Sequence, residues 1–380
     1  METQMLIGKP SDFTPRSLIY IENKIQANQN KREQTILLAK KAGCLARNTR
    51  IPEAKNLTKE LQTANIGHDP RLSGWLLYAE GLIEHFGSLN NSKSQEKFKR
   101  ALSISRIALD KELTGVAAAW LAHCELVCGD IPSTVANLVT AFEWLGPENG
   151  EARGRASMVL ADTLNWAGRN DLARIWYKIA RQHAIQDGDI AMQNVMIFNT
   201  AAFGVASLTI RDCQGALSPQ DWRFISLEVA SSKNLHFALG VEALASTVSN
   251  MQAELFVVQK KWLEALTLFN ENITQAPDEG QQRVLSKLLA QRAWCKANLG
   301  DNLGAENDIN ATKLYINDCV DLDDLAILNF RISAAAELIG DSVAEAHHKE
   351  TAIGYFDRFK QQQIEIQHLI FKAFPKIDSK

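Results

Sequence analysis

The sequence predicts an all-α protein made of about eight antiparallel helix hairpins followed by a C-terminal helix. Segments with the periodicity of amphipathic helices alternate with turn signals such as Gly300-Asp301 along most of the chain. No run of alternating β-branched residues bounded by turn pairs indicates a sheet. Small residues recur roughly 40 positions apart, one on the first helix of each expected hairpin. They are Ala42, Ala79, Ala122, Ala161, Ala201, Ala253, Ala293 and Ser333.

Residues 156–180 form the clearest expected hairpin. A small residue and a leucine lie on its first helix, a glycine marks the turn, and two alanines flank a tyrosine on its second helix. Small residues let two helices approach closely, the aromatic ring fills the space beside them, and glycine ends the first helix. The residues in question are Ala161, Leu164, Gly168, Ala173, Tyr177 and Ala180.

The same spacing recurs in other parts of the chain. Residues 293–312 and 253–277 give good copies, whereas residues 79–101 carry a longer turn, and weaker copies include Ala42, Ala122 and Ser333. Over roughly residues 34–352 the pattern closely resembles that of the tetratricopeptide-repeat family. The resemblance implies a right-handed superhelical array of helix hairpins, an α-solenoid, with an inner groove.

Three parts of the chain are expected from these patterns. Residues 1–17 contain Gly8, Pro10 and Pro15 and are expected to form a flexible N-terminal arm. Residues 18–343 form the helical array, in which residues 204–219 are irregular and predict either a broken repeat or a loop. Residues 344–380 are expected to give a long amphipathic helix that caps the array, and a tail.

Three segments carry a finer resemblance. ARIWYKIARQHAIQDGD, QRAWCKANLGD and EAHHKETAIGYFDRF are similar to segments of helical-repeat regions in bacterial signalling proteins. In those proteins the array often precedes a diguanylate cyclase domain. The present sequence ends at Lys380, so we expect no such output domain here.

Composition and charge limit the partners. The chain has 46% hydrophobic and 22% charged residues, as is typical of a globular protein, and its net charge is -3. No basic stretch followed by an apolar core opens the sequence, and no apolar run is expected to span a bilayer, so we expect a cytoplasmic protein without a membrane partner. Residues 1–111 are basic, with 18 Lys and Arg against 11 Asp and Glu, but the acidic remainder argues against a nucleic-acid partner.

No motif indicates catalysis. The serine elbow, zinc helix, phosphate loop and dinucleotide fingerprint are all missing from the sequence. Cys124 and Cys128 share a helix face but make an incomplete zinc site, and adjacent His347 and His348 diverge on a helix. The acidic residues at 321–324 are interpreted as a helix cap. The sequence therefore predicts no catalytic residue, no metal site and no cofactor.

The tetratricopeptide resemblance implies that binding residues lie on the first helix of each hairpin and face the inner groove. Matched to the repeat offsets, the candidates are His123, Arg155, Asp162, Asn165, Asn250, Glu254, Lys287 and Trp294. Several are polar where packing does not require it. We expect them to be exposed in the groove, so that substitutions change the free energy of unfolding by less than about 0.5 kcal/mol.

Two functions compete on this basis. The first is a non-enzymatic scaffold that binds a protein or peptide in its concave groove, an inference by analogy with the fold. The alternative is a regulatory sensor module that binds a peptide or small ligand in a bacterial signalling pathway. The signalling-protein resemblance favours the second, and the missing catalytic motifs favour either over an enzyme.

Overall fold

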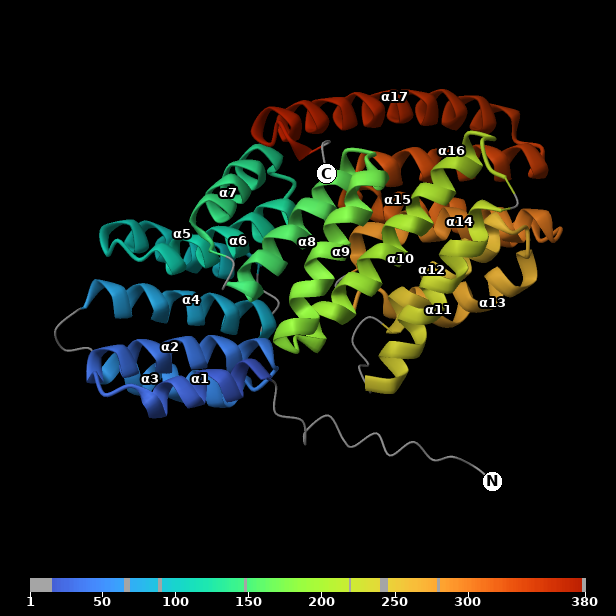
Figure 1. Ribbon diagram of the computed structural model, residues 1–380. Helices are drawn as coiled ribbons and strands as arrows, with labels where there is room; N and C mark the ends of the chain where they lie inside the picture. Colours follow the sequence, from blue (N-terminus) through green and yellow to red (C-terminus); the bar gives the residue numbers. More distant parts are fainter. Residues whose placement is uncertain are drawn as a thin grey trace. The chain divides into compact units, whose positions relative to one another are not determined.

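A computed structural model describes residues 16–64, 69–87, 91–146, 149–218, 220–239, 245–278 and 281–377. Within these ranges the chain is all α, as predicted, and contains no β-strand (Figure 1). The helices are α1 (Arg16–Ala27), α2 (Lys31–Arg47), α3 (Ile51–Ala64), α4 (Pro70–Gly87), α5 (Asn91–Ile107), α6 (Lys111–Val127), α7 (Ile131–Trp144), α8 (Gly150–Trp166), α9 (Asn170–Asp187), α10 (Ile190–Cys213), α11 (Asp221–Leu239), α12 (Ala245–Val258), α13 (Trp262–Asn272), α14 (Leu285–Asn298), α15 (Asn302–Tyr315), α16 (Leu322–Ile339) and α17 (Ser342–Ala373).

The chain forms two compact units. Unit 1 comprises residues 1–196 and 365–380, and unit 2 comprises residues 197–364. The N-terminal arm expected at residues 1–17 falls almost entirely outside the described residues.

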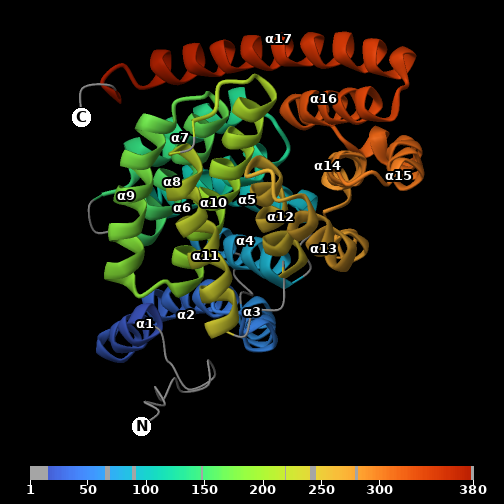
Figure 2. The same cartoon turned by 90° about the vertical axis from the view of Figure 1, so that its right-hand side faces the viewer.

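The helices pack as consecutive antiparallel pairs, consistent with a helical repeat. We call the even-numbered helices from α2 to α16 the first helices, and their partners α3 to α17 the second helices. In unit 1, α2 contacts α4, α4 contacts α6, and α6 contacts α8, whereas α14 contacts both α12 and α16 in unit 2 (Figure 2). All eight small residues used to define the repeat lie on first helices and are buried.

Seven of the pairs are closed by the same turn. A residue one or two positions after the first helix has a positive φ, its N–H donates to the carbonyl three residues earlier, and the next N–H donates to the carbonyl five residues before it. This is the Schellman closure, which favours glycine because a Cβ crowds the left-handed conformation. The turn residues are Thr49, Gly129, Gly168, Gly215, Lys260, Gly300 and Gly340.

The residue after the glycine explains why Gly-Asp pairs recur in the sequence. Asp130, Asp301 and Asp341 each accept a hydrogen bond from the backbone N–H three residues further on, at 2.9–3.1 Å. An aspartate in this position caps the N-terminus of the second helix. The dipeptide therefore ends one helix and begins the next.

Within the segment 204–219, residues 204–213 belong to helix α10 and residues 214 and 215 form a turn, whereas residue 219 lies outside the described residues. Helix α10 continues through Gly204, and a Cβ there would lie 2.7 Å from Cδ1 of Ile225 on α11. The glycine thus permits close contact between the two helices of this pair. The turn at Gly215 follows the common pattern.

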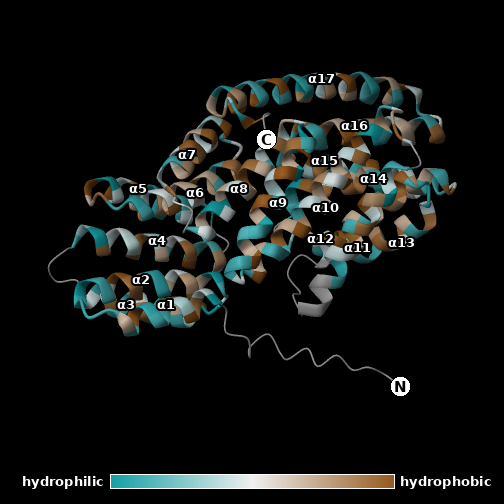
Figure 3. Cartoon of the chain, in the orientation of Figure 1, coloured by the Kyte–Doolittle hydropathy of each residue, from teal (hydrophilic) through white to brown (hydrophobic). Residues whose placement is uncertain are grey.

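Helix α10 also corrects an expectation about membranes. Among the described helices it is the one whose length and apolar composition would suffice to cross a bilayer, although no such segment was expected. Only 22% of its apolar window is buried, unlike that of a typical core helix. Ala201, Val205 and Leu208 of α10 are buried and pack in one core cluster of unit 2 with Ile225 and Val229 of α11. Polar and apolar residues alternate along most of the other helices, as amphipathic packing requires (Figure 3).

The left-handed turns can be tested with two matched glycines. A Cβ at Gly300 (φ 82°) or at Gly354, within α17, would meet no atom within 4 Å, so packing does not distinguish them. We expect Gly300→Ala to lower the free energy of unfolding by about 1 kcal/mol and Gly354→Ala to raise it by up to about 1 kcal/mol. Urea denaturation measures both. Equal effects at the two positions would contradict the assigned turn.

Candidate binding site on the first helices of unit 1

Three neighbouring first helices of unit 1 bring aromatic rings and one arginine together. His85 lies on α4, Trp120 and His123 lie on α6, and Arg155 lies on α8. The ring of His85 is 5.2 Å from both the Trp120 and the His123 rings, measured between centroids. The guanidinium carbon of Arg155 lies 4.0 Å from the centroid of Trp120. We call these four residues the α4–α6–α8 cluster.

Arg155 carries the charge of this cluster. Burial, together with the nearby Arg155, lowers the pKa of His85 to about 4, and burial and Arg155 also lower the pKa of His123. Both rings are therefore neutral at pH 7. The side chain of Arg155 is only 6% exposed, and burial lowers its pKa as well.

Hydrogen-bond donors of the cluster lack acceptors among the described residues. Nε1 of Trp120, a residue only 1% exposed, has no partner there, and neither does Nδ1 of His123. Arg155 forms no ion pair within 4.0 Å in this part of the chain, and its Nη1 lies 4.0 Å from the sulfur of Met158. Buried polar groups are normally satisfied, so this arrangement indicates a missing acceptor.

A second polar cluster in unit 1 contains an arginine with direct counter-ions, although Nε of that arginine, Arg47, has no partner among the described residues. The guanidinium of Arg47 lies 2.8 Å from Glu151 and 3.0 Å from Asp189, and the Tyr78 hydroxyl donates to Glu151 at 3.3 Å. Burial raises the pKa of Glu151, while Arg47 opposes that rise. These two carboxylates also act on Arg155 at longer range, but their close contacts are with Arg47.

Two predicted groove residues on α8 instead hold their own helix pair together. The hydroxyl of Tyr177 on α9 donates to Asp162, and the side-chain amide of Asn165 lies 3.4 Å from the same hydroxyl. Tyr177 and Asp162 are buried. The contact therefore fixes the second helix against the first.

The predicted groove residues of unit 2 lie on α12 and α14, and three of the four contact partners on other first helices. Lys287 lies 3.1 Å from Glu254 on α12 and 2.9 Å from Asp324 on α16. Burial alone would lower the pKa of Lys287, but Asp324 and Glu254 raise it above its ordinary value. Asp324 lies in the first turn of α16, as the helix-cap interpretation predicted, and it is also the second counter-ion of this lysine.

Trp294 and Asn250 complete the predicted set in unit 2. The guanidinium carbon of Arg331 on α16 lies 4.0 Å from the centroid of Trp294, and the arginine is ion-paired with Asp212 at 2.6 Å. Asn250 is buried, and its Oδ1 has no hydrogen-bond partner among the described residues. The sequence pattern did not identify Arg331 as a partner of Trp294, because the two residues lie 37 positions apart and in different repeats.

The expectation that the eight residues are exposed is wrong. Five are buried and the other three are half-buried. First helices pack directly against one another, so long side chains on their facing surfaces reach the next first helix instead of solvent. The buried members are Arg155, Asp162, Asn250, Glu254 and Lys287.

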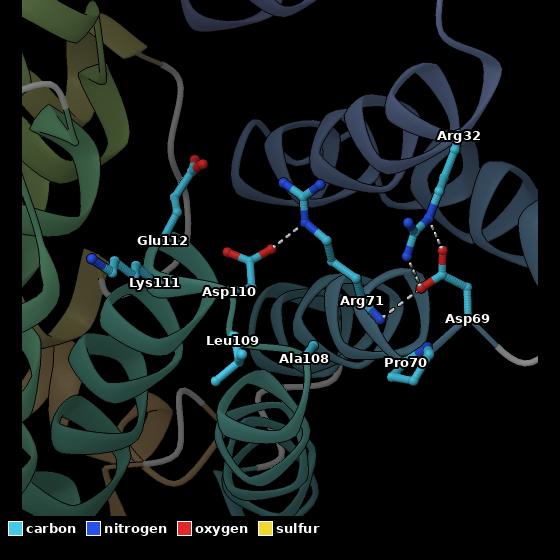
Figure 4. Close-up of a pocket in the computed structure, with 9 residues that line it drawn as sticks. All are labelled: Arg32, Asp69, Pro70, Arg71, Ala108, Leu109, Asp110, Lys111 and Glu112. Atoms are coloured by element: carbon cyan, nitrogen blue, oxygen red, sulfur yellow. Dashed lines mark hydrogen bonds and ion pairs between the residues drawn. The ribbon is translucent and has the colours of Figure 1, made fainter.

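A cavity of about 530 Å³ lies elsewhere in unit 1, near the starts of α4 and α6 (Figure 4). Four of its six charged lining residues are paired with one another: Arg32 contacts Asp69 at 2.5 Å, and Arg71 contacts Asp110 at 2.7 Å. Among the described residues, no group of three or more His, Cys, Asp or Glu side chains is arranged to hold a metal ion. The cavity therefore offers fewer unsatisfied groups than the α4–α6–α8 cluster.

Comparison with known proteins identifies no relative of the chain. No family model matches the sequence, and no curated protein does so at a significant level.

The ion triad of unit 2 gives a stability prediction. Lys287→Ala leaves two buried carboxylates without their cation, so we expect the free energy of unfolding to fall by about 3–5 kcal/mol. Lys349→Ala, at an exposed position on α17, is the matched control and should stay within about 0.5 kcal/mol. Chemical denaturation of both variants measures the difference. A Lys287 variant as stable as the control would show that the triad contributes little.

Asp323 gives a pH prediction. Burial and the neighbouring Asp324 raise its pKa to about 7. A carboxyl whose pKa is higher in the folded than in the unfolded state stabilises the fold below about pH 4, and this contribution is lost as the pH rises toward 7. We expect wild type to lose about 2 kcal/mol more than Asp323→Asn between pH 4 and pH 8. Parallel urea curves at both pH values test this, and identical losses would contradict it.

Proposed function

We propose that the chain is a non-enzymatic binding scaffold of the tetratricopeptide type, whose first helices receive a protein or peptide segment. The observation that carries the proposal is the α4–α6–α8 cluster. It places an arginine, an indole N–H and two neutral imidazoles from three successive first helices within contact of one another. Donors without acceptors on neighbouring helices are what a ligand with carbonyl or carboxylate oxygens requires.

The architecture supports the same function. Stacked helix pairs contact mainly their neighbours, so an array extends a surface without a large change in its core. An extended peptide can then contact several first helices in turn. Aromatic rings and arginine are also the residues that dominate binding energy at protein interfaces.

A regulatory sensor would use the same surface for a peptide or a small ligand. The similarity of three segments to signalling proteins favours this alternative. A small molecule that stays bound through gel filtration and is seen by native mass spectrometry would support the sensor over the scaffold.

Selection of peptides on the purified chain tests the scaffold. Peptides from a displayed random library should bind wild type and lose at least about tenfold in affinity with His123→Glu, because the added carboxylate fills the cluster and engages its donors. Lys178→Glu, an exposed charge reversal on α9, is the control and should keep binding. Isothermal titration measures affinity, and circular dichroism verifies folding.

Two outcomes would contradict the scaffold proposal. The first is that no peptide is enriched on wild type over a bare surface. The second is that peptides are enriched but lose affinity with Lys178→Glu and not with His123→Glu, because binding would then involve the second helices.

A further inference from the structure

Each unit contains one buried arginine stacked on a tryptophan of the preceding first helix. In unit 1, Arg155 on α8 stacks on Trp120 of α6, and in unit 2, Arg331 on α16 stacks on Trp294 of α14. The guanidinium carbon lies 4.0 Å from the ring centroid in both. The arginines are 6% and 1% exposed, so each is largely removed from water.

The two arginines differ in their counter-ions. Arg331 has Asp212 at 2.6 Å, whereas Arg155 has no carboxylate within 4.0 Å among the described residues. Burial lowers the pKa of Arg155, and Asp189 and Glu151 are the carboxylates that oppose this electrostatically. Both of them are in direct contact with Arg47 instead. A buried guanidinium without a direct anion is costly, and stacking on an indole offsets only part of that cost.

Other donors surround the same place. The buried Nε1–H of Trp120 has no acceptor, and Nδ1 of His123 has no partner in the described part of the chain. The neighbouring imidazoles are neutral, so they neither repel nor replace an anion. Arginine matches a carboxylate with two parallel N–H donors, which a single oxygen of water does not satisfy.

We propose that Arg155 is an anion-binding subsite and that the ligand of the α4–α6–α8 cluster supplies a carboxylate to it, as an Asp or Glu side chain of a bound peptide does. This inference rests on the proposed scaffold function for the source of the carboxylate. Trp120 holds the guanidinium in place, and its own N–H is available to the same ligand. The free protein therefore keeps Arg155 at a cost to stability that ligand binding removes.

The first test needs no ligand. Arg155→Met removes a buried charge that has no direct counter-ion and keeps an unbranched side chain against Trp120. We expect its urea midpoint to equal or exceed that of wild type. Arg331→Met is the matched variant, and its midpoint should fall because Asp212 is left without its partner. An equal fall in both variants would overturn the proposal, since Arg155 would then be a structural residue.

The second test uses free anions. Glutarate should raise the melting temperature of wild type in a saturable way relative to sodium chloride of equal ionic strength, and it should not do so for Arg155→Met. Arg331 is already paired, so a shift that survives in Arg155→Met assigns the binding elsewhere and overturns the proposal. Inorganic phosphate is the comparison anion. A shift with phosphate and none with glutarate would overturn the choice of a carboxylate.

The third test separates this subsite from the scaffold function. Glu→Gln and Asp→Asn scans of the selected peptides should find one acidic residue whose loss weakens binding at least tenfold to wild type and not to Arg155→Met. If the selected peptides bind without any such acidic residue, the carboxylate subsite is contradicted and the scaffold function is supported. If glutarate binds saturably but no peptide is selected, the subsite is supported and the scaffold function is contradicted.

Discussion

The close approach of helices at small residues is the constraint on which the rest of the structure depends. Eight residues, seven alanines and Ser333, lie on the first helices and are buried. A larger side chain at such a contact would force the helices apart, because protein interiors have little free volume. Within each unit, neighbouring first helices therefore stack directly on one another, from α2 to α8 in unit 1 and from α12 to α16 in unit 2, and the side chains on their facing surfaces must find partners there.

That stacking determines what polar residues on the first helices can do. A charged side chain between two first helices loses most of its hydration, so it needs a counter-ion from a neighbouring helix. Lys287 receives two, and Arg331 receives one. Arg155 occupies the same kind of place with a tryptophan ring and, among the described residues, no carboxylate in contact. Counter-ions within the chain account for the burial of the first two residues, whereas for the third we propose an anion supplied by a ligand.

Local signals in the sequence were enough for the fold, because each helix pair is specified by residues close together in the chain. Ala161, Gly168 and Tyr177 fall at the expected places on α8, in the turn and on α9. Two turns escaped the pattern, since Thr49 and Lys260 adopt the left-handed conformation usually given to glycine. The partners of Lys287 and Trp294 could not be found in this way. They lie one repeat away, Glu254 on α12 and Asp324 and Arg331 on α16, and only the packing of one first helix on the next brings them into contact.

Rigidity gives the unpaired arginine its value for binding. Arginine ordinarily loses about 2 kcal/mol of side-chain conformational entropy when it is fixed, and a flexible surface arginine loses it on binding. Arg155 has already lost that freedom, because it is buried and stacked on Trp120. The ring of Trp120 is itself stacked on Phe98 of α5, with 5.7 Å between the ring centroids. Folding thus bears the cost of ordering the guanidinium, and a carboxylate that reaches it meets donors that are already positioned. The paired Arg331 differs because Asp212 already accepts from its Nη2, so its charge has a direct counter-ion, although its Nε has no partner among the described residues.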